Sequence, residues 1–362
     1  MSGVAYHLRA TLLPYGDAPT DIWIADCKLT FAPQRGAEEL ASAGGFVLPG
    51  LVDCHVHLTL DFAESGLPPG SVQLVDANLR GHLISGTLLL RDIGAVSDAT
   101  LHLSHQTSPS VHAAGRFLAP ADGYFGLQQP TTSDELVGRV TQQVRSGARW
   151  IKVIADFPRN PGDLMNGEAN YPQEVLNNAV EAAHVAGARV AVHTMSRAGI
   201  EAGLASGVDS IEHGPAIDEH LLTSMAARGI PWTPTLVIAS AAAGMAEEMG
   251  GSRAAAAVRD GFENASNLVP TAARLGVTIL AGTDMLPPGC VWQEVAALFR
   301  TGLDPADALA AASTTARAFL GEPGLEEGAP ADLVLYGSDP RNDPELLSSP
   351  ALVVLNGERV EL

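Results

Sequence analysis

Cysteine and basic side chains are scarce in this chain of 362 residues. Three widely spaced cysteines are too few for a disulfide framework. Lysine and arginine total 21, against 41 aspartate and glutamate residues, which gives a net charge of −20. A surface of that sign repels nucleic acid and anionic membranes, so we expect neither as a partner.

Long apolar runs are also missing. No run reaches the roughly 18 apolar residues that a membrane-spanning helix needs. The first residues, MSGVAYHLRATLLPYG, lack the basic segment and apolar segment of a secretory signal. We therefore expect a cytoplasmic protein; assembly into a homo-oligomer is left open.

Apolar residues are abundant, at 46% of the chain, and they recur in short runs. Eight strand-like runs alternate with helical segments, and this alternation predicts an α/β fold, a TIM-like (β/α)8 barrel of parallel strands. The runs are 50–58, 86–94, 110–116, 149–156, 189–195, 208–214, 230–237 and 277–284.

Both ends of the chain contain short strand-like runs and turns. We expect 1–48 and 325–362 to pair into a small β-sandwich domain, with 49–324 forming the barrel. Within the barrel, Ser133 is the expected N-cap of one helix. The Ala- and Gly-rich segment 239–258 is expected to be a helical insertion, with a mobile flap as the alternative.

Polar residues stand at the ends of several of the predicted strands. The run Asp53-Cys-His55-Val-His57 puts three polar side chains on one face, because side chains alternate along a strand. A single histidine in a strand is more often a core residue, but this chain repeats the pattern in five strands. The further residues are Lys152, His193, His213 and Asp284.

Imidazoles and carboxylates at one end of a barrel are typical of a metal centre. Zinc is the expected ion, with manganese, iron or cobalt as alternatives. Lys152 fits such a centre only if burial favours its neutral amine, which can take up CO₂ to give a carbamate that bridges two metals. The alternative is a structural lysine paired with Asp156 or Asp284.

These motifs together resemble the amidohydrolase superfamily over nearly the whole chain. RWIKVIAD, VAVHT, VDSIEHG, PTL and AGTD are most similar to its prolidase and imidazolonepropionase-like branch. The resemblance implies two divalent metals bridged by N6-carboxylysine at Lys152 and by a hydroxide. The implied metal ligands are His55, His57 and Asp284 for one ion and His193 and His213 for the other.

The same resemblance implies hydrolysis of an amide-type C–N bond, or an ester or lactone C–O bond. Asp284 would act as general base and then acid, and His213 would also contact the carbonyl oxygen. Glu212 should point away from His213 in a regular strand. Alternatives are a mononuclear imidazolonepropionase-like ring hydrolase or deaminase, a phosphotriesterase-like enzyme, an Xaa-Pro or Xaa-Arg dipeptidase, and an inactive scaffold.

Dipeptidase activity is the less favoured alternative because one motif departs from the family pattern. Dipeptidases of this branch often have a Gly-Gly-His element after the third strand, and here Tyr124 takes the place of that histidine. We expect Tyr124, Phe62 and Phe157 to contact substrate, with Met285 at the rim and Trp292 as a packing residue. Arg159 is the one candidate to bind a substrate carboxylate.

Overall fold

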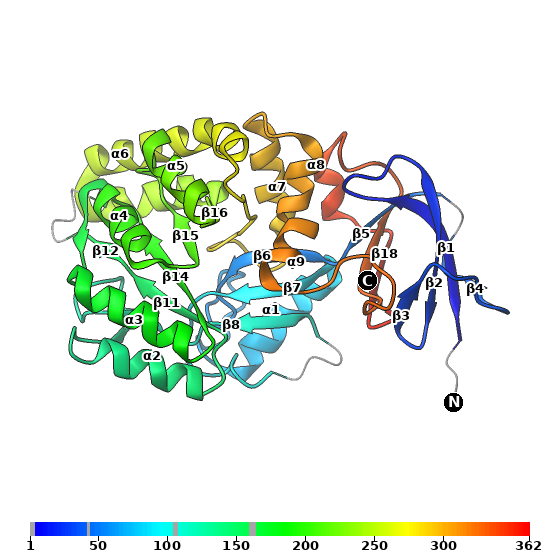
Figure 1. Ribbon diagram of the computed structural model, residues 1–362, viewed down its shortest axis with the longest axis horizontal. Coiled ribbons are helices and arrows are strands. Elements are labelled where there is room, and N and C mark those ends of the chain that lie inside the picture. Colours follow the sequence, from blue (N-terminus) through cyan, green and yellow to red (C-terminus); the bar gives the residue numbers. More distant parts are fainter. Residues whose placement is uncertain (1–3, 42–43, 104–107, 159–163) are drawn as a thin grey trace.

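The computed structural model describes residues 4–41, 44–103, 108–158 and 164–362. Figure 1 shows an α/β body with helices around its strands and, beside it, a sheet built from both ends of the chain. This arrangement agrees with the predicted TIM-barrel-like α/β fold. None of the described helices is long and apolar enough to cross a membrane.

The strands of the α/β body form two parallel sheets and a small hairpin. One sheet has the order β6-β7-β8, and the other has the order β10-β9-β11-β14-β15-β16. Their bounds are β6 Leu51–Val56, β7 Thr87–Asp92, β8 Ser110–Ala113, β9 Phe117–Ala119, β10 Gln129–Pro130, β11 Trp150–Ile154, β14 Arg189–Thr194, β15 Ser210–His213 and β16 Trp232–Thr233. The hairpin pairs β12 (Asp156–Phe157) with β13 (Glu168–Ala169).

Backbone contacts connect the edges of these two sheets. Trp232 of β16 makes a parallel bridge with Ile279, and the Cys54 amide of β6 donates to the Ala281 carbonyl over 2.8 Å. On the other side, the Arg149 amide donates to Ala113 of β8 over 2.9 Å. The described strands are thus arranged as in a TIM-like fold, although they are assigned to two sheets and not to one closed eight-stranded barrel.

The helices lie outside the strands, and α2, α3 and α4 pack on the outer side of β11 and β14 (Figure 1). Their bounds are α1 Val72–Ile84, α2 Leu136–Arg145, α3 Gln173–Val185, α4 Arg197–Ser206, α5 Glu219–Arg228, α6 Ala239–Leu275, α7 Val291–Arg300, α8 Pro305–Ala311 and α9 Thr314–Leu320. Three short 3-10 turns are η1 Leu164–Asn166, η2 Leu236–Ile238 and η3 Pro344–Ser348.

The helices lie where the sequence predicted them, but one predicted helix start is wrong. α6 shows that 239–258 is helical, as expected, apart from an interruption at Gly251. The predicted N-cap Ser133 is wrong, because α2 begins at Leu136 with Glu135 as its N-cap residue. The Glu135 carboxylate accepts hydrogen bonds from Thr132. The N-cap residue therefore lies two residues later than predicted.

Strands from both ends of the chain form one eight-stranded sheet. β5 pairs in parallel with β1 on one side and antiparallel with β17 on the other, so N- and C-terminal strands share ladders. In the described residues these strands make a single sheet, and a separate second layer of the expected sandwich is not seen. The bounds are β1 Tyr6–Leu12, β2 Pro19–Ala25, β3 Lys28–Thr30, β4 Glu38–Glu39, β5 Phe46–Pro49, β17 Leu333–Tyr336, β18 Leu352–Leu355 and β19 Glu358–Arg359.

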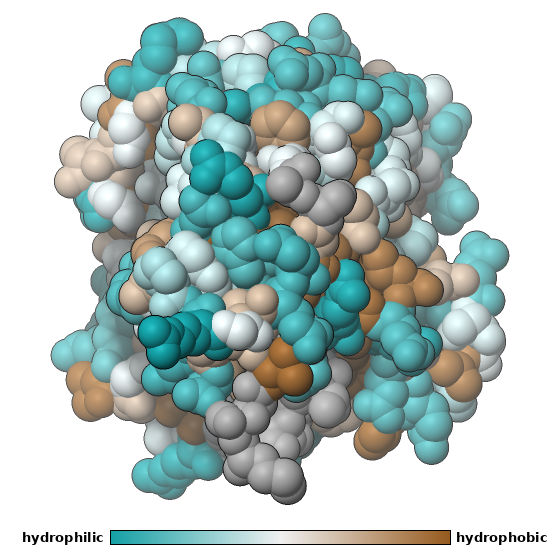
Figure 2. Space-filling view, turned by 90° about the vertical axis from the view of Figure 1, so that its right-hand side faces the viewer, coloured by the Kyte–Doolittle hydropathy of each residue, from teal (hydrophilic) through white to brown (hydrophobic). Residues whose placement is uncertain are grey.

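The two parts have separate apolar clusters. The terminal sheet buries residues such as Leu8, Ile22 and Leu333, whereas a larger cluster lies between the strands and helices of the α/β body. The division at 1–48, 49–324 and 325–362 itself stays a prediction. Figure 2 views the molecule from the side of the terminal sheet, and most of this face is hydrophilic, with hydrophobic residues in small separate groups.

Candidate metal centre and active site

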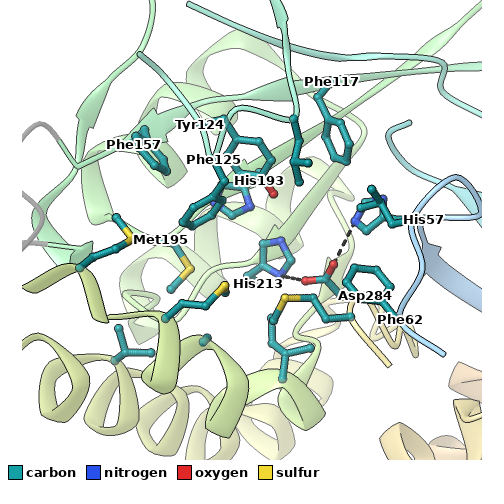
Figure 3. Close-up of a pocket in the computed structure, with 18 of the residues that line it drawn as sticks. His57, Phe62, Phe117, Tyr124, Phe125, Phe157, His193, Met195, His213 and Asp284 are labelled. Atoms are coloured by element: carbon teal, nitrogen blue, oxygen red, sulfur yellow. Dashed lines mark ion pairs between the residues drawn. The ribbon is translucent and has the colours of Figure 1, made fainter. Parts of the chain in front are cut away.

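The six predicted ligands come together at the carboxyl ends of the strands. His55 lies in β6 and His57 follows it, Lys152 and His193 lie in β11 and β14, and His213 ends β15. The imidazole centroids of His55 and His213 are 4.8 Å apart, and those of His193 and His213 are 4.6 Å apart. Figure 3 shows His57, His193 and His213 pointing toward Asp284.

His55, His57 and Asp284 form a compact cluster of ligand atoms. One atom from each lies within 4.8 Å of the others, which allows a single metal ion to be held between them. The His57 Nε2 atom is 2.9 Å from Asp284 Oδ1, and the His55 Nε2 atom is 3.8 Å from the same oxygen. Two neutral imidazoles and one carboxylate are a suitable donor set for zinc and similar ions.

The two imidazoles of this cluster are oriented through their other ring nitrogens. His57 Nδ1 lies 2.8 Å from the Gly94 carbonyl, and His55 Nδ1 lies 2.8 Å from a Glu212 carboxylate oxygen. These acceptors place a proton on each Nδ1, which leaves each Nε2 with a lone pair directed at the cluster. This is the tautomer that a metal ligand needs.

Glu212 is held in turn by Arg91, and both side chains are fully buried. One Arg91 nitrogen lies 2.8 and 2.9 Å from the two carboxylate oxygens of Glu212. Burial opposes a charge on Glu212, but the charges of Arg91 and Lys152 keep its pKa below the ordinary value. As expected, the Glu212 side chain points away from His213. It contacts His55 instead.

Arg91 was not identified from the sequence. The available signal is a cation inside the apolar run GTLLLRDIG, because a fully buried arginine needs partners. Those partners are the Cys54 carbonyl, Ser210, Glu212 and Thr233, together with the Trp150 ring 4.8 Å from the guanidinium carbon. They lie too far apart in the chain to be recognised as one group without coordinates.

Lys152 has no hydrogen-bond partner for its Nζ atom and is only 1% exposed. Burial lowers its pKa to about 8, against the opposing effect of Glu212 and Asp284, so the neutral amine is readily available. The alternative pairing with Asp156 is wrong, because Asp156 bonds to Thr194, Met195 and Ser196. An unpartnered buried amine is what the carbamate hypothesis requires.

His193 and His213 form the second predicted ligand pair. The His193 Nδ1 atom is buried without a partner, whereas His213 Nδ1 lies 2.8 Å from the Thr235 hydroxyl. Burial and neighbouring positive charges put the pKa of both imidazoles well below the ordinary value, so they are neutral. The unpartnered atoms of His55, Lys152 and His193 are buried polar groups that a bound cation would satisfy.

The position of Asp284 depends on close backbone contact with β6. Its amide donates to the His55 carbonyl over 2.7 Å, and its φ of 52° is left-handed. A Cβ on Gly282 would lie 2.5 Å from the His55 Cβ, so only glycine permits this approach. Asp53 supports the same turn by accepting hydrogen bonds from the amide and hydroxyl of Thr283, and does not join the ligands.

A cavity of about 390 Å³ opens onto four of the candidate ligands, His57, His193, His213 and Asp284. Its lining includes Phe62, Tyr124 and Phe157, the three residues expected to contact substrate, and Met285 at the rim. Trp292 packs against the main apolar cluster, as expected. Arg159, the candidate for binding a carboxylate, lies outside the described residues.

The Tyr124 phenol is placed to face the reaction centre. Burial and the Asp284 charge raise its pKa, so it stays protonated and can donate a hydrogen bond. Its ring lies 5.2 Å from that of His193, and Figure 3 shows its oxygen directed into the cavity beside the histidines. The position of Tyr124 therefore agrees with the expectation from the sequence, and its role remains a prediction.

Comparisons with known proteins show what this chain is similar to. The model of a family described as the amidohydrolase family matches residues 46–360. An uncharacterized protein of Mycobacterium tuberculosis is 35% identical over 98% of this chain and 95% of its own length. Ochratoxinase of Aspergillus niger is 27% identical over 85% of this chain and 73% of its length.

Solved structures give the same result. A crystal structure from Bifidobacterium longum, provisionally assigned as a prolidase, superposes with a TM-score of 0.84 and 25% sequence identity. The match covers 100% of this chain and 96% of the other. The resemblance noted in the sequence is thereby confirmed, and the hydrolases among these proteins support a hydrolase here.

Proposed function

The chain belongs to the amidohydrolase family, and from this premise we propose that it is a metal-dependent hydrolase of small molecules. The bond cleaved would be an amide-type C–N bond, or the C–O bond of an ester or lactone. One observation carries the proposal: three of the predicted ligands, His55, Lys152 and His193, each have a buried nitrogen without a hydrogen-bond partner. A scaffold protein has no use for three such atoms.

Each residue of the cluster has a place in this proposal. His55, His57 and Asp284 would hold one divalent ion, and His193 and His213 a second, with carboxylated Lys152 between them. Zinc is the expected ion, and manganese, iron and cobalt are alternatives. Bound ions of this kind lower the pKa of a water molecule and polarise a carbonyl group.

The protein itself moves the proton. Asp284 lines the cavity beside His57, with 11% of its side chain exposed, and it would accept the proton of the attacking water. It would then donate that proton to the leaving amine or alcohol. The Tyr124 hydroxyl and His213 would bind the carbonyl oxygen as negative charge develops on it.

A mononuclear enzyme, such as a ring hydrolase or deaminase, is the second candidate. It is favoured by the cluster of His55, His57 and Asp284, the one set of three mutually close ligand atoms found in the described residues. Metal stoichiometry separates the two: two ions per chain for the binuclear enzyme and one for the mononuclear enzyme.

The Lys152→Ala substitution tests the metal centre. We expect reconstituted wild-type protein to hold two ions per chain, and Lys152→Ala to lose metal and activity against a panel of amides and lactones. Short carboxylic acids should partly restore both. Lys28→Ala is a matched control, because Lys28 is the only other lysine of the chain. Two ions retained by Lys152→Ala without added acid, measured by elemental analysis, would contradict the bridging role.

Asp284→Asn tests the proton transfer. We expect kcat to fall by about 10²- to 10⁴-fold, the usual contribution of a general acid or base, while metal remains bound. Steady-state kinetics on the best amide of the panel measures the effect, with the exposed Asp76→Asn on α1 as control. An unchanged kcat would remove Asp284 as the proton carrier.

A further inference from the structure

The first part of α6 faces the cavity with one side. Ile238, Ala242, Met245 and Met249 follow one another at intervals of four, three and four residues, which is the spacing of a single helical face, and all four line the cavity. The opposite side carries the exposed Glu247 and Glu248. This segment ends at Gly251, whose φ of 76° and ψ of −176° interrupt the helix.

Four methionines share this side of the cavity, and we call them the methionine wall: Met195, Met245, Met249 and Met285. The chain contains seven methionines, so more than half of them line one cavity. They come from three separate segments, since Met195 follows β14, Met285 follows Asp284 and the other two lie in α6. Figure 3 shows several sulfur atoms between the helix below and His213 above.

An aromatic cluster forms the other side of the cavity. Tyr124 lies 5.5 Å from Phe117, 5.0 Å from Phe125 and 6.0 Å from Phe157, measured between ring centroids. Figure 3 shows these rings in the upper part of the view and the sulfur atoms below them, with Asp284 to the right. A group that enters beside Asp284 would therefore have thioethers on one side and aromatic rings on the other.

This combination selects a particular kind of group. A methionine side chain has three rotatable bonds and a polarisable sulfur, so it adapts to rings of different outline and attracts them. Burial of the apolar surface of the ring adds to this attraction. A charged group at the same place would lose its hydration, and the wall offers it no partner.

We propose that the methionine wall is the specificity element of this enzyme, and that it binds an uncharged aryl group attached to the scissile amide or ester. The wall accepts a range of aryl groups because its side chains rearrange without strain. The reaction at this group rests on the proposed function, whereas the binding of the group does not. A neutral naphthalene probe can therefore test the wall without any hydrolysis.

Binding of the neutral naphthalene fluorophore prodan is the first test. We expect saturable binding to the full-length wild-type protein, with the emission shifted to shorter wavelength. In Met245→Ala/Met249→Ala the dissociation constant should rise about tenfold, because two apolar contacts are removed. Alanine is a strong helix former, so α6 should be retained, and circular dichroism checks this.

Two further variants sharpen the result. Glu247→Ala/Glu248→Ala, on the exposed side of the same helical turns, should bind prodan like the wild type. Met249→Gln keeps the length of the side chain and its helix propensity but is polar, and it should weaken binding in the same direction as the double alanine variant. Equal affinity in wild type, Met249→Gln and the double alanine variant would overturn the proposal, and so would a wild type that does not bind prodan.

Steady-state kinetics then separate the contribution of the methionine wall to specificity from the reaction itself. For metal-reconstituted protein, kcat/KM for N-(2-naphthyl)acetamide relative to acetamide should fall about tenfold in the double alanine variant, because acetamide is too short to reach the wall. A ratio equal to that of the wild type would contradict the specificity role. If no amide is cleaved while prodan binding still depends on Met245 and Met249, the proposed function fails and the binding proposal stands.

Discussion

At the scale of single residues, the contact between Glu212 and His55 has the clearest consequence. The carboxylate fixes the proton on His55 Nδ1 and is itself held by Arg91. In metal sites, the group that orients a histidine ligand commonly changes metal affinity by 10- to 100-fold. Glu212 is therefore a positioning residue, since it contacts His55 and is not itself one of the candidate ligands.

Glu212→Gln should raise the metal dissociation constant by about 10- to 100-fold, as measured by competition with a chromogenic chelator. The amide can still contact His55, but it leaves the buried Arg91 without its counter-charge, which is itself destabilising. The double variant Arg91→Met/Glu212→Gln separates the two effects, because it removes the buried charge. If the double variant recovers stability but still binds metal weakly, the result supports a positioning role for Glu212. Wild-type metal affinity in both variants would contradict that role.

The residues that could be read from the sequence share a simple feature. His55, His57, Lys152, His193 and Asp284 each interrupt or end an apolar run, so their common location at strand ends follows from the strand pattern alone. The support around them could not be predicted in this way. Arg91 is separated by 119 and 121 positions from Ser210 and Glu212, and only the fold brings them together.

At the scale of elements, α7 determines the position of the loop beside the cavity. Its buried residue Glu294 accepts hydrogen bonds from the Leu236 and Val237 amides, 3.0 Å each, at the start of η2. The preceding Thr235 contacts His213 and has a φ of 48°, which is unusual for a β-branched side chain. Glu294 thereby stabilises a strained residue that supports a candidate ligand.

Glu294 should also make stability depend on pH. Burial raises its pKa from 4.5 to about 8. Between these values the folded protein keeps a proton that the unfolded chain releases, so the free energy of unfolding falls as pH rises. Glu294→Gln has no such proton and should show a shallower fall between pH 5.5 and 8. Urea denaturation at several pH values measures this, and equal slopes for the two proteins would contradict it.

The sequence predicted the location of the elements better than it predicted their exact ends. The runs expected as strands contain β6, β7, β8, β11, β14, β15 and β16, because apolar segments of this length bounded by turns have few alternatives. The start of α2 was misplaced because Ser, Asp and Glu follow one another at 133–135 and each is compatible with a helix N-terminus. The choice between them depends on the tertiary position of the preceding turn.

At the scale of the whole molecule, the arrangement of strands into sheets could not be predicted in full. Alternating strands and helices indicate parallel pairing and a TIM-like order, which the structure shows. How the run 277–284 meets its neighbours depends on single contacts, the bridge of Ile279 with Trp232 and the hydrogen bond from Cys54 to Ala281, and the pattern of apolar residues does not encode them. The same limit applies to the terminal strands, which were expected to form two layers and form one sheet.

That sheet has a consequence for how the protein is made. β5 ends at Pro49, and its neighbour β17 begins at Leu333, so the 283 residues 50–332 emerge from the ribosome between the two partners. At about 5–20 residues per second this takes roughly 15–60 s. During that interval one edge of β5 in the nascent chain has no strand partner. A chaperone that shields strand edges would bind the chain at this edge.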